Sequence, residues 1–191
     1  FYGWEEGYFN TLDITMDKLG FYIIWGCLVY VPFLYTLSTY YLVLYPPSLS
    51  WAESSCIMFF GIFSILMNYW VDYQKQIFIE KNGDVVIWGS KAKYIETKYT
   101  FNGEEKNGKL LISGFWGLSR HVNYLFEIML SISWCLPAVK VSFIPFLYPI
   151  FIFILLLHRT LRDEKKCSEK YKMYWNQYCE IVKYRFIPYI F

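Results

Sequence analysis

Four apolar stretches separated by polar segments dominate the pattern along the chain. Residues 21–45 contain no formally charged side chain, and neither do residues 54–71. A helix of about 20 apolar residues is long enough to cross the hydrocarbon core of a bilayer. We therefore predict membrane-spanning helices near 21–45 and 54–71, with a kink at Pro32 in the first.

The other two apolar stretches lie close together in the second half of the chain. From Tyr124 to Leu157 the apolar pattern is interrupted by Glu127 and by the motif "PAVKV" at residues 137–141. This interruption predicts two helices, near 124–137 and 141–157, of which the first is short. We expect the second to continue past Leu157 into a charged segment.

The segment between the two pairs has a different character. Residues 72–120 contain fourteen charged side chains, several glycines and short alternating pieces such as "DVVIWG" and "KYIETKYT". This pattern predicts a helix that ends within Lys75–Ile79, followed by a polar surface hairpin between Gly83 and Lys109.

The expected fold class is therefore all-α. We predict a polytopic membrane helix bundle with about four membrane helices, a polar insert at 72–120 that forms a small hairpin between spans, and a C-terminal segment at 158–191. All of these parts are expected to belong to one membrane domain.

Composition supports a membrane protein. The 191 residues are 56% hydrophobic and 23% aromatic, whereas only 18% are charged, which is more apolar than an average soluble domain. Residues 158–191 hold eight lysines or arginines against four acids, which favours a cytoplasmic C-terminus by the positive-inside rule. The five cysteines form no CxxC pair and there are two histidines, so we predict no metal site. No nucleic-acid partner is expected.

The charged residues after Leu157 are predicted to form a stripe, because residues three and four apart share a helix face. The stripe consists of Arg159, Arg162 or Asp163, Lys166 or Cys167, and Lys170 or Tyr171. Arginine and lysine suit phosphates, and a carboxylate among them accepts hydrogen bonds from hydroxyls or amides. Spacing alone also allows an ordinary membrane boundary, where long basic side chains reach lipid headgroups.

A second polar group lies in "LLISGFWGLSRHVNYLFE", residues 110–127. Two glycines allow tight turns, and ionisable side chains at the start of a buried membrane helix are candidates for a functional site. The polar and aromatic members are Trp116, Arg120, His121, Asn123, Tyr124 and Glu127. For His121 alone, a structural hydrogen-bonding role is the expected one. Neither GxGxxG nor GxxxxGK occurs, so a nucleotide would have to bind through a site other than a Rossmann or P-loop motif.

Two long motifs, "LLISGFWGLSRHVNY" and "LLLHRTLRDEKKCSEKYKMYWNQYCEIVKYRFIPYIF", closely resemble the sterol reductase family. This family includes the delta-14 and delta-24(28) sterol reductases and the membrane domain of the lamin B receptor. The motifs "LDITMDKLGFYIIWGCLVYVPFLYTLSTYYLV" and "VVIWGSKAKYIETKYTFNGEEKNGKLLISGFWG" most resemble the branch that acts on 7-dehydrocholesterol-type sterols. The resemblance covers nearly the whole chain and matches the C-terminal part of longer family chains. We therefore expect the family's N-terminal helices to lie outside this sequence.

This resemblance implies a multi-pass enzyme of the endoplasmic reticulum membrane that reduces a sterol carbon–carbon double bond, of the delta-7 type, with NADPH. The implied partners are the sterol substrate and membrane lipid. In the family, the cofactor lies at the cytoplasmic side of the C-terminal helices. The positions that match its contacts are Lys75, Leu111, Trp116, Asn123, Tyr124, Arg159, Asp163, Cys167, Ser168, Glu169, Lys170, Tyr171 and Tyr178.

The matched residue types suggest roles by their chemistry. Lys75 and Arg159 would neutralise phosphates, whereas Trp116 and Tyr171 would pack on flat rings. Asp163 and Asn123 would orient polar groups. The proton donor stays open among Asp163, Tyr124 and a tyrosine of the expected N-terminal part.

Three departures from the family pattern bear on these roles. Phe126 and Glu127 stand where the family usually has Gly-Asp, and Ile79 stands where an arginine is usual. Lys172 replaces a glycine. We expect Lys81 or Lys172 to supply the positive charge that is missing at Ile79.

Two other functions are consistent with the sequence. A reductase-like module could bind sterol or a partner without turnover. An isoprenylcysteine carboxyl methyltransferase-like enzyme would share the Arg-His pair followed by Tyr124, but such enzymes usually have proline at Val122 and lack "HRTLRDE".

Overall fold

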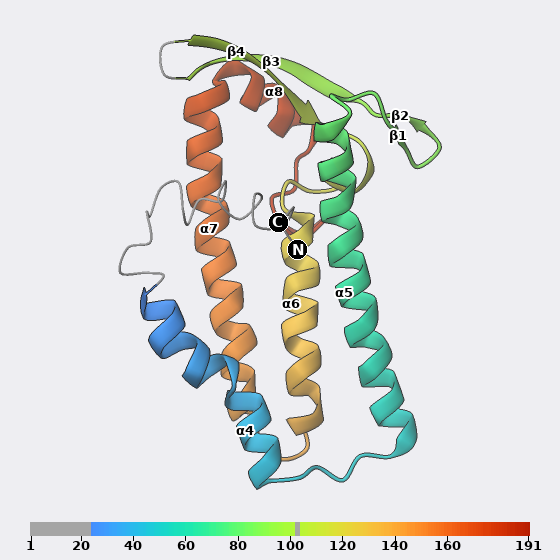
Figure 1. The fold of residues 1–191 in the computed structure, drawn as a ribbon, viewed down its shortest axis with the longest axis vertical. Coiled ribbons are helices and arrows are strands. Elements are labelled where there is room, and N and C mark those ends of the chain that lie inside the picture. Colours follow the sequence, from blue (N-terminus) through green and yellow to red (C-terminus); the bar gives the residue numbers. More distant parts are fainter. Residues whose placement is uncertain (1–23, 102–103) are drawn as a thin grey trace. The chain divides into compact units, whose positions relative to one another are not determined.

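The computed structural model describes residues 24–101 and 104–191, which are mostly helical (Figure 1). The contacts divide the chain into two compact units. Among the described residues, the first contains residues 24–48 together with Ala138–Tyr148, and the second contains Leu49–Pro137 together with Pro149–Phe191.

The first unit is built around a π-helix that contains a proline and continues as an α-helix. A π-helix, η1 (Gly26–Tyr35), contains Pro32 and is followed by α4 (Leu37–Leu44). The hydroxyl of Thr36 donates a 2.6 Å hydrogen bond to the carbonyl of Pro32. The disturbance expected at Pro32 therefore takes the form of a π-helix and a break at Thr36.

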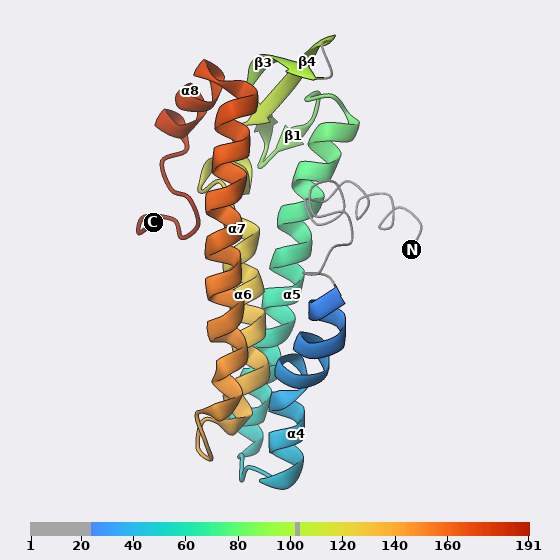
Figure 2. The same cartoon turned by 90° about the vertical axis from the view of Figure 1, so that its left-hand side faces the viewer.

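Three helices form the frame of the second unit. They are α5 (Trp51–Glu80), α6 (Val122–Cys135) and α7 (Leu147–Tyr171), of which α7 begins in the first unit. The α5 and α7 helices run in the same direction, and α6 runs the opposite way (Figures 1 and 2). A Cβ added at Gly61 of α5 would come within 3.1 Å of the Ser133 Oγ of α6. The two helices therefore approach closely at small residues, as membrane helices often do.

Sequence and structure agree on a multi-pass membrane bundle. Within the described residues, three helical segments are long and apolar enough to cross a bilayer, namely Gly26–Leu44, Trp51–Glu80 and Ile144–Tyr171. The α6 helix has 14 residues and is about 21 Å long, which is shorter than a hydrocarbon core of about 30 Å. The prediction of about four membrane helices thus becomes three candidate spans and a shorter apolar helix.

The α5 helix is longer than the apolar stretch that predicted it. Its start is fixed by a capping box, in which Ser50 Oγ accepts from the Glu53 amide and the Glu53 carboxylate accepts from the Ser50 amide. Its end at Glu80 lies inside the predicted polar insert. Val71, Gln74 and Phe78 are buried at helical spacing, which gives this last part of the helix a packed face.

The polar insert forms two hairpins, where a single one was expected between Gly83 and Lys109. A short hairpin joins β1 (Val86–Ile87) to β2 (Ser90–Lys91). A longer antiparallel pair joins β3 (Tyr94–Phe101) to β4 (Glu104–Leu111), with Tyr94 opposite Leu111. The pair β3–β4 lies beside α8 (Met173–Ile181), near the end of α7 (Figure 1).

A single strained residue separates α7 from α8. Lys172 has φ 50° and ψ −117°, a backbone conformation that L residues rarely adopt. The sequence resemblance predicts glycine at this position, and glycine adopts such conformations without a steric penalty. The side chain of Lys172 is exposed.

We expect Lys172→Gly to stabilise the protein, because it removes a strain of roughly 1 kcal/mol or more. The midpoint of thermal unfolding of the purified protein in detergent should rise. Lys166→Gly is the matched control, since this exposed lysine lies inside α7 and its replacement should cost about 1 kcal/mol. A lower midpoint for Lys172→Gly would contradict the strained geometry.

Candidate functional site

The placement of Trp116 depends on a tight approach between α5 and the short 3-10 helix η2 (Gly114–Gly117). The Phe115 amide donates to Gln74 Oε1 at 2.8 Å, and Trp116 Nε1 donates to the Val71 carbonyl at 3.0 Å. Gly114 has φ +67°, and a Cβ there would collide with Gln74 and Ile87. Glycine is therefore required for Trp116 to pack against α5.

Trp116 in turn supports a cation from α5. The Lys75 ammonium lies 4.0 Å from the centroid of the Trp116 ring, within the range of a cation–π interaction. Asp72, one helical turn before Lys75, accepts a hydrogen bond from the Asn123 side chain at the start of α6. Two charged residues of α5 thus contact the segment that contains the second sequence motif.

His121 lies where this segment meets α7. Its Nε2 is 3.8 Å from Asp163 Oδ2, which is too long for a hydrogen bond. Its ring stacks on Tyr124 with centroids 5.2 Å apart and an interplanar angle of 11°. The Cys167 thiol lies 3.9 Å from the same Asp163 oxygen. Asp163 is also close enough to Lys75 for the two charges to interact.

The structure therefore gathers a polar cluster from α5, η2, α6 and α7. We call it the boundary cluster, and its members are Asp72, Lys75, Trp116, His121, Asn123, Tyr124, Asp163 and Cys167. Six of these residues were matched to cofactor contacts from sequence, whereas Asp72 and His121 were not.

Arg120 fixes the cluster to the C-terminal segment. Its guanidinium donates to the Val182 carbonyl at 2.8 Å and to Glu164 Oε1 of α7 at 2.6 Å. Arg185 reaches the other oxygen of the same carboxylate at 2.8 Å. The amides of Arg120 and His121 donate to the carbonyls of Tyr184 and Arg185. The backbone entering α6 is thus held by α7 and by the chain after α8.

The electrostatics of the cluster keep His121 neutral near pH 7. Burial is the main cause that lowers the pKa of His121 to about 3, and the nearby charges of Lys75, Arg120 and Arg159 lower it further. Its contact with Asp163 is therefore not an ion pair at neutral pH. Burial also raises the pKa of Tyr178 in α8, which stays a protonated hydrogen-bond donor.

The other sequence-predicted residues lie around this cluster rather than in it. Leu111 is buried in the apolar core that also contains Trp116. Arg159 lies one turn before Asp163 on the same helix face and acts on His121 through its charge. Tyr178 packs in a separate apolar cluster with Trp175 and Val182.

The run Cys167–Tyr171 divides between two faces of α7. Cys167 faces the cluster, whereas Ser168 and Glu169 are exposed. Lys170 and Tyr171 meet the β3–β4 hairpin, where the Lys170 ammonium lies 4.1 Å from the Tyr99 ring centroid and Tyr171 packs edge-on against that ring at 5.4 Å. Tyr99 had no signal in the sequence, because strand pairing brings it there.

An open groove of about 720 Å³ lies beyond Lys75, at the end of α5. Ile79 and Tyr174 provide apolar surface, and Lys98, Asn107 and Lys109 of the hairpin provide polar surface. Lys109 also donates to the Asn82 carbonyl at 2.6 Å. Ile79, which lines the groove, lies one helical turn after Lys75 on the same face of α5.

Two polar atoms of the cluster are suited to a polar ligand. His121 Nε2 and Asn123 Oδ1 are buried, and neither has a hydrogen-bond partner among the residues that the structure describes. Buried polar atoms are normally satisfied, and such exceptions occur at binding and catalytic sites. Together with the Lys75 charge, the cluster can hold a ligand that carries both hydrogen-bonding groups and negative charge.

One departure from the family pattern has a clear structural partner. The Glu127 carboxylate accepts a 3.0 Å hydrogen bond from the Asn68 side chain of α5. Phe126, in the preceding position, is buried and packs edge-on against Phe63 at 6.4 Å. The two residues therefore take part in the packing of α6 on α5.

Comparison with known proteins places these features in a family context. Residues 2–191 match the ergosterol biosynthesis ERG4/ERG24 family. A 7-dehydrocholesterol reductase of Arabidopsis thaliana is 45% identical over 192 residues, which cover 100% of this chain and 44% of that protein. A 7-dehydrocholesterol reductase of Xenopus laevis is 40% identical, and the match covers 98% of this chain and 40% of that protein. A delta(14)-sterol reductase of Schizosaccharomyces pombe is 37% identical, and the match covers 98% of this chain and 42% of that protein. The chain thus spans less than half the length of these relatives.

The neutral state of His121 predicts a loss of stability in mild acid. Because its pKa is about 3 in the folded protein and about 6.5 in the unfolded chain, its contribution is complete above pH 6.5 and declines as the pH falls. The decline should reach about 2 kcal/mol at pH 5. Thermal unfolding between pH 7 and 5 should therefore depend less on pH in His121→Gln. His158→Gln, at an exposed position, should keep the original dependence, and equal slopes in both variants would contradict the assignment.

Proposed function

Because the chain belongs to the ergosterol biosynthesis ERG4/ERG24 family of sterol reductases, we propose that it forms the cofactor-binding part of an enzyme that reduces a sterol double bond with NADPH. The observation that carries this proposal is the boundary cluster. It combines the Lys75 charge, an adjacent acid and two unsatisfied buried polar atoms at the membrane-exit ends of α5 and α7.

The residues present fit a phosphate-bearing dinucleotide. Lys75 and Arg159 supply positive charge, and Asn123 and His121 each offer a buried polar atom that needs a partner. The groove beside Ile79 gives room for the part of such a molecule that extends away from the membrane. NADPH, when bound, supplies the hydride for reduction.

The protein's own residues have distinct roles in this proposal. Trp116 positions Lys75 through its ring, so it acts by holding a cation and not by stacking on the cofactor from that face. Asp163 is the candidate for holding or moving a proton, because it has His121 and Cys167 as its close polar neighbours. Tyr124 is the second candidate, and its ring is fixed by the stack on His121.

The proposal extends to the substrate and the location of the enzyme, and the family relation supports both. The proposed substrate is a sterol with a delta-7 double bond, since relatives named 7-dehydrocholesterol reductase share 45% and 40% identity and a delta(14)-sterol reductase shares 37%. The apolar part of α7 ends at Leu157, below Asp163, so a sterol in the bilayer would approach the cluster from the lipid side. We place the enzyme in the endoplasmic reticulum membrane, with its C-terminus in the cytoplasm.

We expect the full-length protein to oxidise NADPH in the presence of a delta-7 sterol and to yield the reduced sterol. Asp163→Ala should lower this activity by about 100-fold or more, with unchanged expression and membrane insertion. Lys165→Ala is the control, because this residue is exposed on the same helix and should keep full activity. Both NADPH oxidation and the sterol product should be measured.

The outcomes separate the competing functions. Saturable binding of NADPH and sterol without turnover would replace the enzyme by a sterol-binding module. Reduction of a delta-14 sterol alone would overturn the proposed substrate but keep the reaction. Binding of S-adenosylmethionine in place of NADPH would favour a methyltransferase.

We also expect Ile79→Arg to tighten NADPH binding by about tenfold, because a new guanidinium in the groove can pair with a phosphate. Ile181→Arg makes the same change at an exposed site on α8 and should leave the affinity unaltered. Unchanged affinity for Ile79→Arg would show that another cation, such as Lys98 or Lys109 of the groove, already fills this role.

A further inference from the structure

The turn between β1 and β2 presents a large aromatic side chain in an unfavourable backbone conformation. Trp88 has φ 49° and the following Gly89 has φ 81°, as in a two-residue type I′ hairpin turn. Asparagine, aspartate or glycine is preferred at the first of these positions, and a bulky residue there is strained. The Trp88 side chain is nevertheless 54% exposed. Strain of this kind is a reason to look for a binding partner.

The aromatic residues of α5 indicate where the bilayer lies. Trp51, at the start of the helix, is 92% exposed, and a second exposed aromatic group follows at Tyr69, Trp70 and Tyr73. From Trp51 to Trp70 a helix rises about 28 Å, which matches a hydrocarbon core of about 30 Å. Tryptophan and tyrosine are enriched at both membrane–water interfaces. These two groups therefore mark the two interfaces.

The α7 helix independently indicates the same position for the membrane–water interface. Its apolar run ends at Leu157, and the charged stripe starts at the next residue. Asp163 lies five or six residues later, just as Lys75 lies five residues after Trp70, and the charges of Asp163 and Lys75 interact. Because α5 and α7 run in the same direction, both helices place the interface about 8 Å below this charged pair (Figure 2).

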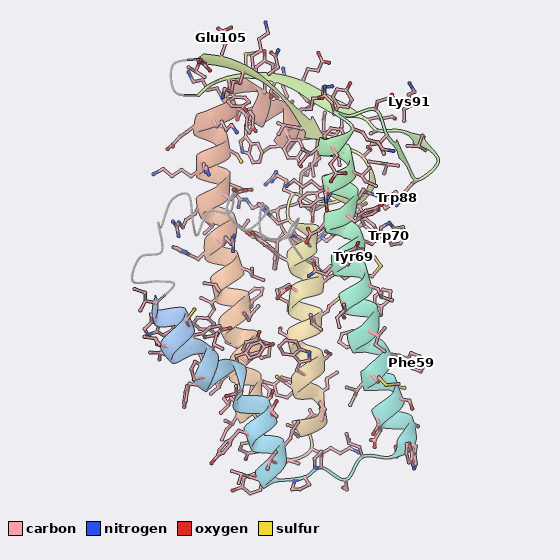
Figure 3. All side chains as sticks on the ribbon, in the orientation of Figure 1. Phe59, Tyr69, Trp70, Trp88, Lys91 and Glu105 are labelled. Atoms are coloured by element: carbon pink, nitrogen blue, oxygen red, sulfur yellow. The ribbon has the colours of Figure 1, made fainter. Side chains whose placement is uncertain are left out.

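Trp88 is held at this interface by its packing. Its ring lies edge-on against Phe115 with centroids 4.9 Å apart, and Trp70 contacts the same Phe115 ring at 5.1 Å. Trp88 and Trp70 lie on the same outer side of α5 (Figure 3). The turn also has a polar side, since Lys91 pairs with Asp84 at 3.7 Å and both side chains are 87% exposed.

From this arrangement we propose that the apolar side of this turn, formed by Val86 and Trp88, is a membrane contact, with Trp88 inserted among the lipid headgroups and Lys91 on the side that faces away from them. The exposed Val86 adds apolar surface, and buried Ile87 fixes the turn to the core beside Phe115. An indole ring suits this position because it is apolar over most of its surface and still carries one N–H donor. The lipid contact offsets the backbone strain and fixes the height of η2, and hence of Trp116, above the bilayer.

The test uses the full-length protein in liposomes, with a photo-crosslinking phenylalanine analogue at position 88, 70 or 91 and a labelled phospholipid. We expect lipid adducts when the probe stands at position 88 or 70. We expect no lipid adduct when it stands at position 91. An adduct at position 88 with another segment of the protein, or the absence of any lipid adduct there, would overturn the proposal.

A second measurement avoids the bulky probe. Brominated phospholipids should quench a smaller fraction of the tryptophan emission in Trp88→Tyr than in the unmodified protein. Trp175→Tyr is the matched control, because Trp175 is buried in the cluster around α8 and its removal should not reduce the quenched fraction. Equal quenching in Trp88→Tyr and the unmodified protein would also refute the contact. Neither experiment depends on sterol reduction, so this proposal can fail independently of the enzymatic one.

Discussion

The candidate site depends on the buried guanidinium of Arg120. It connects the start of α6 to Glu164 of α7 and to the Val182 carbonyl after α8, and Arg185 shares the same carboxylate. Breaking a buried pair on one side leaves an uncompensated charge, which typically costs about 3–5 kcal/mol. His121 is the next residue, so the geometry of His121 and Asp163 relies on this connection. The pair positions the chemical groups and does not take part in the proposed reaction.

The sequence predicted the parts of this protein that follow from local pattern. Apolar stretches gave the membrane bundle, and helical spacing after Leu157 placed Arg159, Asp163 and Cys167 on one face of α7, as the structure has them. Contacts between distant segments had no such signal. The Asp72–Asn123 hydrogen bond and the Lys75–Trp116 contact join residues more than 40 positions apart, and only the packing of α5 against α6 and η2 creates them.

The departures from the family pattern differ in their physical meaning. Glu127 reaches Asn68, and Phe126 fills space against Phe63, so both are accommodated by the packing of α6 on α5. Lys172 is accommodated only with a strained backbone, at a position where its side chain is exposed. At Ile79 the groove is lined by an apolar side chain in place of a cation. Lys98 and Lys109 of the hairpin line the same groove. The same chain thus combines well-packed substitutions with one that carries a conformational cost.

The carbonyls of Tyr184 and Arg185, which accept from the amides of Arg120 and His121, also impose an order on biosynthesis. The segment entering α6 is translated more than 60 residues before these partners. Until then the Arg120 charge and two backbone amides must be solvated by water or shielded by other proteins at the membrane surface. Insertion of the helices can therefore precede assembly of the site, and a chain that stops before residue 184 would be membrane-integrated but would lack the partners that hold the start of α6.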